Sequence, residues 1–300
     1  MHIITSADPV SPNATGGVTI VINKDLANTT GTQVYEIVPG RALMISVPWH
    51  RDKTITVLSV YAPTNNQEST IFWEELNIGR QGRPQPDVIL GDFNLVEDAL
   101  DRLPPHRDPP APTEGLTNLI TALDMTDGWR ETHPDTLQYT YSQSLRQGAA
   151  HSRIDRIYIR RDGLKFSNNW EISTPGIPTD HQLVSAQITD AVLPFIGKGR
   201  WVFPSHLINN KKAMRALTSL CRKAETAMNE IAVRTDELNP QTIFDNLIKD
   251  IKDTATLEAR LATSNLDKEI RNLETERDIA TNDETKSVEA RQITTALLQE

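Results

Sequence analysis

Two polar residues follow a short apolar run in the first third of the sequence. Asp92 and Asn94 come directly after Val88-Ile-Leu-Gly91, a run that is typical of a buried strand. Since residues two apart in a strand point to the same side, an extended strand end would direct both side chains into one site. A carboxylate is a hard oxygen ligand for Mg²⁺, and an amide can bind a phosphate oxygen. The alternative is a strand that ends in an Asx turn, and this stretch alone does not decide between the two.

Polar side chains also stand at other strand ends and turns. Tyr61 ends a stretch rich in β-branched residues, and Asp155 lies inside Ser152–Tyr158 with apolar residues on both sides. Asp180 and His181 follow a proline-containing turn, directly before the next predicted strand. Each has an ordinary structural explanation when taken alone: packing for the tyrosine, an edge ion pair for Asp155, and a turn for the last pair.

Strands dominate the first two thirds of the chain, with few helices between them. The predicted strands are Gly17–Lys24, Arg41–Trp49, Lys53–Tyr61, Val88–Asn94, Leu137–Ser142, Arg153–Ile159, Lys165–Ser173 and Gln182–Ile188. Helices are predicted over Ser69–Leu76 and around Leu116–Leu123. This order, with a hairpin turn at residues 50–52, favours a layered α/β sandwich of mixed or antiparallel sheets over a doubly wound parallel fold.

The pattern changes after about Leu193, where the strand-like stretches stop. The first domain is predicted to span residues 1–195, a linker residues 196–210, and a helical connector residues 211–300. Asn239-Pro240 supplies a cap and a first position for a long helix, whose apolar stripe runs from Ile243 to Leu273. The other faces of this helix carry mixed charge, so a solvated arm and an arm that mediates self-association both remain open.

Composition limits the partners of the chain. It carries 31 Lys and Arg against 40 Asp and Glu, a net charge of -9, so it is not a module that binds nucleic acid by bulk charge. Candidate cations for a local contact, either with a DNA backbone or with the headgroup of a small phosphoester, are Arg102, Arg107, Arg130, Arg146, Arg153 and Arg156. The single cysteine excludes a disulfide framework and a cysteine-rich zinc site. No apolar run has the length of a membrane span and the opening residues lack the pattern of a secretory signal, so an intracellular protein is expected.

Four short motifs follow one another in a fixed order. They are Val60-Tyr-Ala-Pro63, Gly91-Asp-Phe-Asn94, Ser152-Arg-Ile-Asp-Arg-Ile-Tyr158 and Thr179-Asp-His-Gln-Leu-Val184. Together they resemble the endonuclease/exonuclease/phosphatase superfamily, which includes DNase I and the apurinic/apyrimidinic endonucleases. The resemblance spans about Gly16 to Leu193 and implies a DNase I-like fold.

Weaker signals refine this resemblance. The stretches Ser11–Val18, Asp127-Gly-Trp-Arg130 and Gly197–Trp201 are similar to parts of the endonucleases of LINE-type non-LTR retrotransposons. In such elements a helical segment joins the endonuclease to a reverse transcriptase, and residues 211–300 resemble that connector. The resemblance therefore implies an endonuclease that nicks DNA and that is expected in the nucleus.

The resemblance also implies roles for individual residues in a reaction that depends on Mg²⁺ or Mn²⁺. His181 would contact the phosphate, and Asp155 would orient its imidazole. Asp92 would position or deprotonate the attacking water, while Asn94 would bind a phosphate oxygen. Tyr61 would donate a hydrogen bond to the phosphate or to the leaving group.

Metal binding is expected at Asp92 and Asp180. The motifs that open the family are a strand with an asparagine and a strand that ends in a metal-binding glutamate, and neither has a counterpart before Gly17. We therefore expect a sandwich that is incomplete at its N-terminus and lacks one carboxylate for Mg²⁺. Two alternatives remain open: a phosphatase or phosphodiesterase of the same superfamily that acts on small phosphoesters, and a non-catalytic remnant whose helices mediate association.

Overall fold

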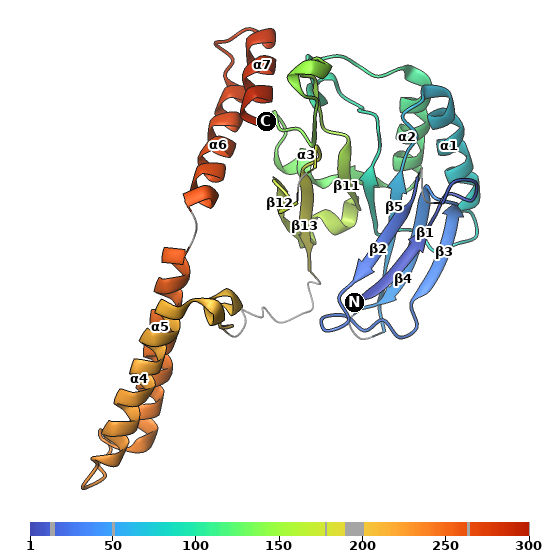
Figure 1. The fold of residues 1–300 in the computed structure, drawn as a ribbon. Coiled ribbons are helices and arrows are strands. Elements are labelled where there is room, and N and C mark those ends of the chain that lie inside the picture. The colour runs from blue at the N-terminus through green and yellow to red at the C-terminus, as the bar shows by residue number, and fades with distance from the viewer. Residues whose placement is uncertain (13–15, 50–51, 178, 190–200, 263–264, 300) are drawn as a thin grey trace. The chain divides into compact units, whose positions relative to one another are not determined.

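The computed structural model describes residues 1–12, 16–49, 52–177, 179–189, 201–262 and 265–299 (Figure 1). The chain divides into two compact units, one made of Met1–Ala191 with Glu274–Glu300 and the other of Val192–Leu273. Parts of several predicted features lie outside the described residues. They are residues 13–15 of the stretch Ser11–Val18, the hairpin turn at 50–51, the turn at Pro178, and residues 190–200, which hold the end of the predicted first domain, the start of the linker and most of Gly197–Trp201.

A six-stranded mixed sheet forms the centre of the first unit. Its strands lie in the order β3 (Gln33–Val38), β4 (Ala42–Pro48), β5 (Thr54–Tyr61), β6 (Val88–Asp92), β11 (Asp155–Arg160) and β8 (Met125–Asp127). β5 and β6 are parallel, and all other neighbours in this sheet are antiparallel. The parallel pair needs a crossover, which α1 (Asn66–Gly79) supplies.

One face of this sheet packs against α1 and α2 (Pro110–Ala122), as Figure 1 shows. Asn65 caps α1, because its side-chain oxygen accepts hydrogen bonds from the backbone N–H groups of Gln67 and Glu68. Apolar residues on alternate positions of the strands point into this larger core, where Trp73 and Phe93 stack with their ring centroids 5.9 Å apart.

The other face of the sheet is covered by two separate antiparallel hairpins. β1 (His2–Ser6) pairs with β2 (Val18–Ile22), and β2 contacts β4 and β5. β12 (Ser167–Ser173) pairs with β13 (Leu183–Ile188), and β13 contacts β11. A second core lies under the latter hairpin, where Trp170 and the Trp129 ring of α3 (Gly128–Thr132) pack on apolar residues of β6 and β11.

A small sheet of three short strands includes β10 (His151–Ser152), which directly precedes the start of β11. The order of the strands in this sheet is β7 (Arg102–Leu103), β10 and β9 (Tyr141–Ser142). The 3₁₀ helix η1 (Ala99–Asp101) precedes β7, and η2 (Leu145–Gln147) lies between β9 and β10. A third 3₁₀ helix, η3 (Arg161–Phe166), connects β11 to β12. Only the last two residues of the predicted strand Leu137–Ser142 are therefore a strand.

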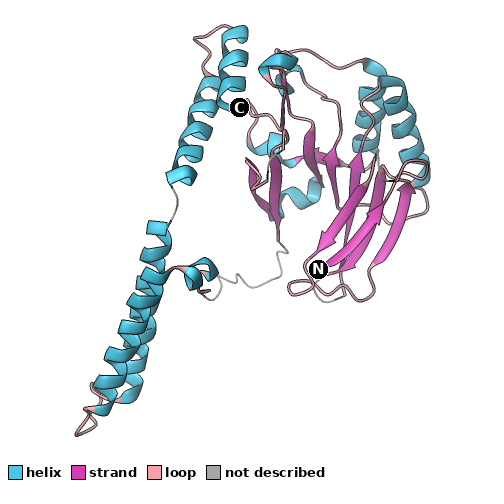
Figure 2. Cartoon of the chain, viewed as in Figure 1, coloured by secondary structure: helices cyan, strands magenta, loops and turns pink. Residues whose placement is uncertain are grey.

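The remaining elements are helical (Figure 2). They are η4 (Ser205–Asn209), α4 (Lys211–Asn229), α5 (Pro240–Ala262), α6 (Asn265–Asn282) and α7 (Val288–Gln299). α4 and α5 pack against each other, whereas α7 and the last turns of α6 belong to the first unit. No helix in the described ranges combines the length and the apolar character that a membrane crossing requires.

The predicted layered α/β fold, with mixed sheets followed by helices, is confirmed. The strands β1, β3 and β8 and the short strands β7 and β10 are not among the predicted ones. β3 lies at the edge of the sheet and two of its first three residues are exposed, so its pattern is less apolar than that of a central strand. The helix expected from Ile243 to Leu273 is described as α5 and α6, with residues 263–264 outside the described chain, and α6 continues to Asn282.

Candidate active site

Three adjacent strands bring three of the predicted site residues side by side. Asp92 ends β6, and its register partner on the parallel strand β5 is Tyr61. On the antiparallel side the register partner of Asp92 is Asp155, the first residue of β11. Because register partners project to the same face of a sheet, these residues form a row at one end of the sheet.

Gly91 makes this close approach possible. Its φ is +138°, and a Cβ at this position would lie 1.9 Å from the carbonyl oxygen of Val60. No side chain fits there, which gives the glycine before Asp92 a steric reason.

His181 joins the row from a distant part of the chain. Its backbone forms an isolated antiparallel β-bridge with Tyr141, and the centroids of the two rings lie 5.1 Å apart. Its Nδ1 atom lies 2.8 Å from Oδ2 of Asp155. One ligand atom from each of Asp92, Asp155 and His181 lies within 4.8 Å of the other two, and all three residues are half-buried. The predicted convergence of these side chains is therefore what the structure contains.

The strand does not stay extended after Asp92. Asn94 has a φ of +50°, and its backbone N–H donates to Oδ1 of Asp92 at 2.9 Å, which is the Asx turn considered as the alternative. The amide nitrogen of Asn94 donates to Oδ2 of Asp92 at 3.2 Å and to the carbonyl oxygen of Ala62 at 2.9 Å. Both amide hydrogens are thus used within the protein, so Asn94 holds the Asp92 carboxylate and offers no free donor to a phosphate.

The two other predicted site residues lie around this cluster. Asp180 is exposed and is not part of the group of three ligand atoms, although its charge acts on His181. The ring of Tyr61 lies under the guanidinium of Arg41, with 5.0 Å between the guanidinium carbon and the ring centroid. Arg41, which sequence patterns did not single out, is therefore a cation close to the site.

Burial and mutual repulsion shift the protonation of the cluster. Desolvation, followed by the charge of Asp155, raises the pKa of Asp92 to about 6. The hydrogen bond to Asp155 raises the pKa of His181, and the charges of Asp92 and Asp180 act in the same direction. The site thus favours a protonated imidazole beside a carboxyl group that ionises near neutral pH.

The donor set of the cluster fits a divalent cation. Mg²⁺ and Mn²⁺ prefer carboxylate oxygens, and Asp92 and Asp155 supply these from adjacent strands. Repulsion from Asp155 contributes to the raised pKa of Asp92, and a bound cation would relieve this repulsion between the two carboxylates. Asp155, rather than the expected Asp180, is the second acid of this cluster.

Most of the arginines proposed to face DNA are engaged inside the protein. Arg153 and Arg156 are each 2% exposed, so neither can contact a DNA backbone. Arg153 pairs with Asp101 and Asp127, each at 2.7 Å, and Arg130 also pairs with Asp101. A fourth arginine, Arg102, pairs with Asp108 at 2.7 Å, which leaves Arg107 and Arg146 as the exposed members of the predicted set.

This buried ion network also explains the stretch Asp127-Gly-Trp-Arg130. The ring of Trp129 packs against the guanidinium groups of Arg130 and Arg153, whose central carbons lie 5.0 Å and 5.2 Å from its centroid. A Cβ on Gly128 would lie 2.1 Å from the ring of Trp170. The stretch therefore serves packing and charge neutralisation at the start of β11.

Two residues that position the site gave no sequence signal. The Thr140 hydroxyl oxygen accepts the backbone N–H groups of Ile154 and Asp155 at 3.0 Å and 2.9 Å. Tyr141 holds His181 by its backbone bridge and its ring. Both lie about forty residues before His181 in the sequence. A threonine and a tyrosine at this distance from a histidine match no motif that would predict a contact with it.

Comparisons with known proteins identify the family of this chain. The Endonuclease/Exonuclease/phosphatase family matches residues 4–181. The "Transposon TX1 uncharacterized 149 kDa protein" of Xenopus laevis is 29% identical over 200 residues, which are 65% of this chain. The aligned part is only 15% of that protein, so this chain spans a small fraction of its relative.

Two solved structures show the extent of the likeness. The endonuclease domain of TRAS1, a telomere-specific non-LTR retrotransposon, matches with 16% identity and a TM-score of 0.49, over 63% of this chain and 81% of that one. An AP endonuclease from Archaeoglobus fulgidus matches with 17% identity and a TM-score of 0.48, over 62% and 79%. The family match covers more than half of the chain and contains Asp92, Asp155 and His181. This chain therefore belongs to the Endonuclease/Exonuclease/phosphatase family.

Proposed function

We propose that the first unit is a metal-dependent phosphodiesterase that nicks DNA and is part of a non-LTR retrotransposon protein. The observation that carries this proposal is the convergence of Asp92, Asp155 and His181 within 4.8 Å. Membership of the family supports hydrolysis of phosphoesters, and the similarity to a transposon protein supports the retrotransposon context. The nucleus is then the compartment in which the protein would meet its DNA.

His181 has the geometry of a group that binds or protonates a phosphate oxygen. Its Nδ1–H donates to Asp155, so Nε2 is the ring atom left for the substrate. The hydrogen bond fixes the tautomer and the ring direction, and the raised pKa of His181 keeps Nε2 protonated to higher pH. Asp155 thus positions the imidazole.

Asp92 is suited to accept a proton from the attacking water. Its carboxylate is held by two hydrogen bonds from Asn94 and ionises near pH 6. A divalent ion bound by Asp92 and Asp155 would neutralise charge on the phosphoryl oxygens as a Lewis acid. Tyr61 and Asp180 remain proposed as a donor to the substrate and as a ligand that reaches the metal through water.

The substrate class is tested with the full chain and two substrates. Supercoiled plasmid and a small phosphomonoester are each incubated with Mg²⁺, Mn²⁺ or EDTA. The proposal predicts conversion of plasmid to open circles that requires metal, without release of phosphate from the monoester. Phosphate release without nicking would instead identify a small-molecule phosphatase. Failure of both reactions, with protein that is folded by circular dichroism, would contradict a catalytic function and favour the non-catalytic alternative.

A further inference from the structure

The C-terminal hairpin, defined here as residues 274–299, belongs to the first unit, and two side-chain amides attach it to residues 137–148 of that unit. Asn282 exchanges two hydrogen bonds with the backbone of Leu137: the Leu137 N–H donates to Oδ1 at 3.0 Å, and Nδ2 donates to the Leu137 carbonyl at 3.1 Å. Gln292 donates from Nε2 to the carbonyl oxygen of Gly148 at 2.7 Å. The backbone carbonyl oxygen of Gln292 lies 3.2 Å from Nε2 of His151.

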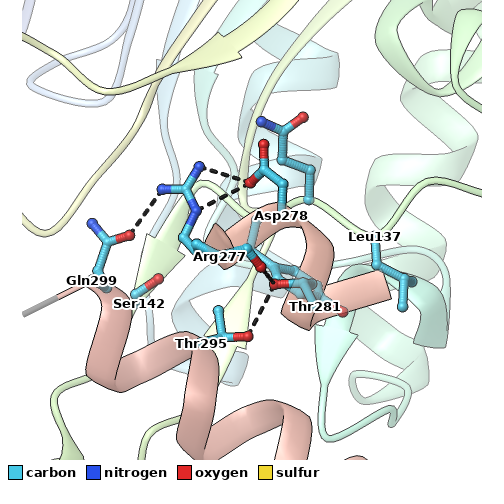
Figure 3. Close-up of a pocket in the computed structure, with 9 residues that line it drawn as sticks. Leu137, Ser142, Arg277, Asp278, Thr281, Thr295 and Gln299 are labelled. Carbon is cyan, nitrogen blue, oxygen red and sulfur yellow. Dashed lines mark hydrogen bonds and ion pairs between the residues drawn. The ribbon is translucent and has the colours of Figure 1, made fainter. Parts of the chain in front are cut away.

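The C-terminal hairpin is also held together internally. The hydroxyl groups of Thr281 on α6 and Thr295 on α7 are hydrogen-bonded at 2.9 Å, and both residues are 3% exposed. Arg277 donates to the side chain of Gln299 at 3.0 Å. Figure 3 shows these residues around a pocket that Leu137 and Ser142 also line. Hydrogen bonds between α6 and α7 therefore hold the two helices of the hairpin together.

The segment that these amides hold leads directly to the candidate active site. Thr140 accepts the backbone N–H of Asp155 through its hydroxyl at 2.9 Å, and its carbonyl accepts the N–H of Gln182 at 2.6 Å. The next residue, Tyr141, forms the bridge and the ring contact with His181. Residues 137–142 thus connect the C-terminal hairpin at one end with Asp155 and His181 at the other.

His151 provides a second connection between the same two places. It is fully buried, its Nε2 atom faces Gln292, and its Nδ1 atom lies 2.9 Å from the hydroxyl of Ser142. The backbone N–H of Ser142 in turn donates to the carbonyl of Asp180 at 3.3 Å. Both connections end at the residues that carry the imidazole. Loss of the side-chain amides would release the first connection directly, and it would weaken the second because the amide of Gln292 helps to hold α7 in place.

We propose that Asn282 and Gln292 are positioning residues, which fix residues 137–142 so that Tyr141 and Thr140 hold His181 against Asp155. This gives the end of the helical region a role in building the site, in addition to any role as a connector. The structural part of the proposal concerns only the placement of His181. Its consequence for catalysis rests on the function proposed above.

The test compares the full chain with Asn282→Ala/Gln292→Ala. The matched control is Asn272→Ala, an exposed asparagine on the same helix. Hydrogen exchange of residues 137–142 and 180–182 should become roughly tenfold faster in the double variant, which corresponds to about 1.4 kcal/mol of local stability, since three exposed hydrogen bonds are lost. Exchange in β4 and β5 should stay unchanged, and the control should match the parent protein. Unchanged exchange at residues 137–142 and 180–182 in the double variant would overturn the proposal.

The imidazole signals of His181 in NMR spectra give a readout that mere destabilisation would not move. Because the ring of Tyr141 lies 5.1 Å from that of His181, its ring current shifts these signals. The double variant should move them toward their positions in Tyr141→Leu, while the signals of exposed His106 stay in place. Signals of His181 that keep their parent positions would contradict the positioning role, whether or not the protein nicks DNA. If nicking is present in the parent, the double variant should lower its kcat more than it raises its KM.

Discussion

Oδ2 of Asp155 lies 2.8 Å from Nδ1 of His181, although 26 residues separate the two along the chain. The register of β11 against β6 puts the same aspartate beside Asp92. Asp155 therefore has two opposite effects on its neighbours: it favours the charged form of the imidazole and disfavours the charged form of the second carboxyl group.

The first prediction follows from the position of Asp155 beside both His181 and Asp92. In the metal-free protein, Asp155→Asn should lower the pKa of His181 toward its ordinary value of 6.5, because the hydrogen bond to Asp155 is the largest cause of its raised value. The pKa of Asp92 should also fall below about 6, although burial will keep it above 3.8. NMR titration of the imidazole and carboxyl signals measures both. Asp180→Asn is the control, and a fall in the pKa of His181 as large as that in Asp155→Asn would count against the assignment.

The second prediction concerns stability in acid. Burial alone would raise the pKa of Asp101, but the charge and hydrogen bonds of Arg153 lower it to about 2 from 3.8. A carboxyl group with a depressed folded-state pKa stabilises the protein above pH 3.8, and this contribution is lost as the pH falls through about 2. The shift corresponds to about 2 kcal/mol of unfolding free energy.

The variant Asp101→Asn separates this pair from other acid effects. It should lower the unfolding free energy at pH 7 by about 3 kcal/mol, because the buried charge of Arg153 loses one of its two partners. The difference from the parent should shrink between pH 4 and pH 2. Urea unfolding at a series of pH values measures it, and a difference that grows toward low pH would refute the assignment.

The third prediction tests the steric role of Gly91. Gly91→Ala should destabilise the protein by about 3 kcal/mol, because the new Cβ would lie 1.9 Å from the carbonyl of Val60. Gly82→Ala is the matched control, since Gly82 also has a positive φ, +72°, but has open space where a Cβ would be. The control should lose only about 1 kcal/mol. Thermal unfolding of the two variants would speak against the explanation if the losses were equal.

The fourth prediction concerns metal binding. Mg²⁺ at ten times its dissociation constant should raise the unfolding free energy of the parent by about 1.4 kcal/mol, since the ion binds the folded site and not the unfolded chain. Asp92→Asn should reduce or abolish this gain, because it removes one of the two carboxylates of the cluster. Calorimetric scans with Mg²⁺ and with EDTA measure the effect. A gain of equal size in the variant would place the ion elsewhere.

The residues of the cluster could be singled out from the sequence because together they match motifs of a known family, and each stands next to a strand or turn with a clear pattern. Asp92 follows an apolar run with a glycine, and Asp155 lies between apolar residues of β11. The sequence could not predict which of these strands and turns contact each other. The contact between Tyr141 and His181 depends on a bridge between two loops, and such register is not encoded locally.

The environment of the arginines could not be predicted from the sequence either. Charge alone suggested that Arg153 and Arg156 face a ligand, yet both side chains are buried in the protein, Arg153 just before β11 and Arg156 within it. Their partners come from residues at other places in the chain, Asp101 for one and Glu97 for the other. A sequence shows where charges occur but not which of them neutralise each other in the interior.

Association through the helices stays a prediction. Phe244, Ile248 and Leu257 on α5 are each about half exposed, which leaves apolar side chains available to a second copy. Sedimentation of the full chain at several concentrations would detect a dimer. A monomer at every concentration would remove this role.

The most direct test of the central claim is the rate at which the chain nicks supercoiled plasmid in Mg²⁺, compared with Asp92→Ala and with the matched control Asp25→Ala, which changes an exposed acid. If Asp92, Asp155 and His181 form the catalytic site, Asp92→Ala should lower the rate by about 10²- to 10⁴-fold, whereas Asp25→Ala should leave it unchanged. Nicking that persists at the parent rate in a folded Asp92→Ala protein would contradict the claim.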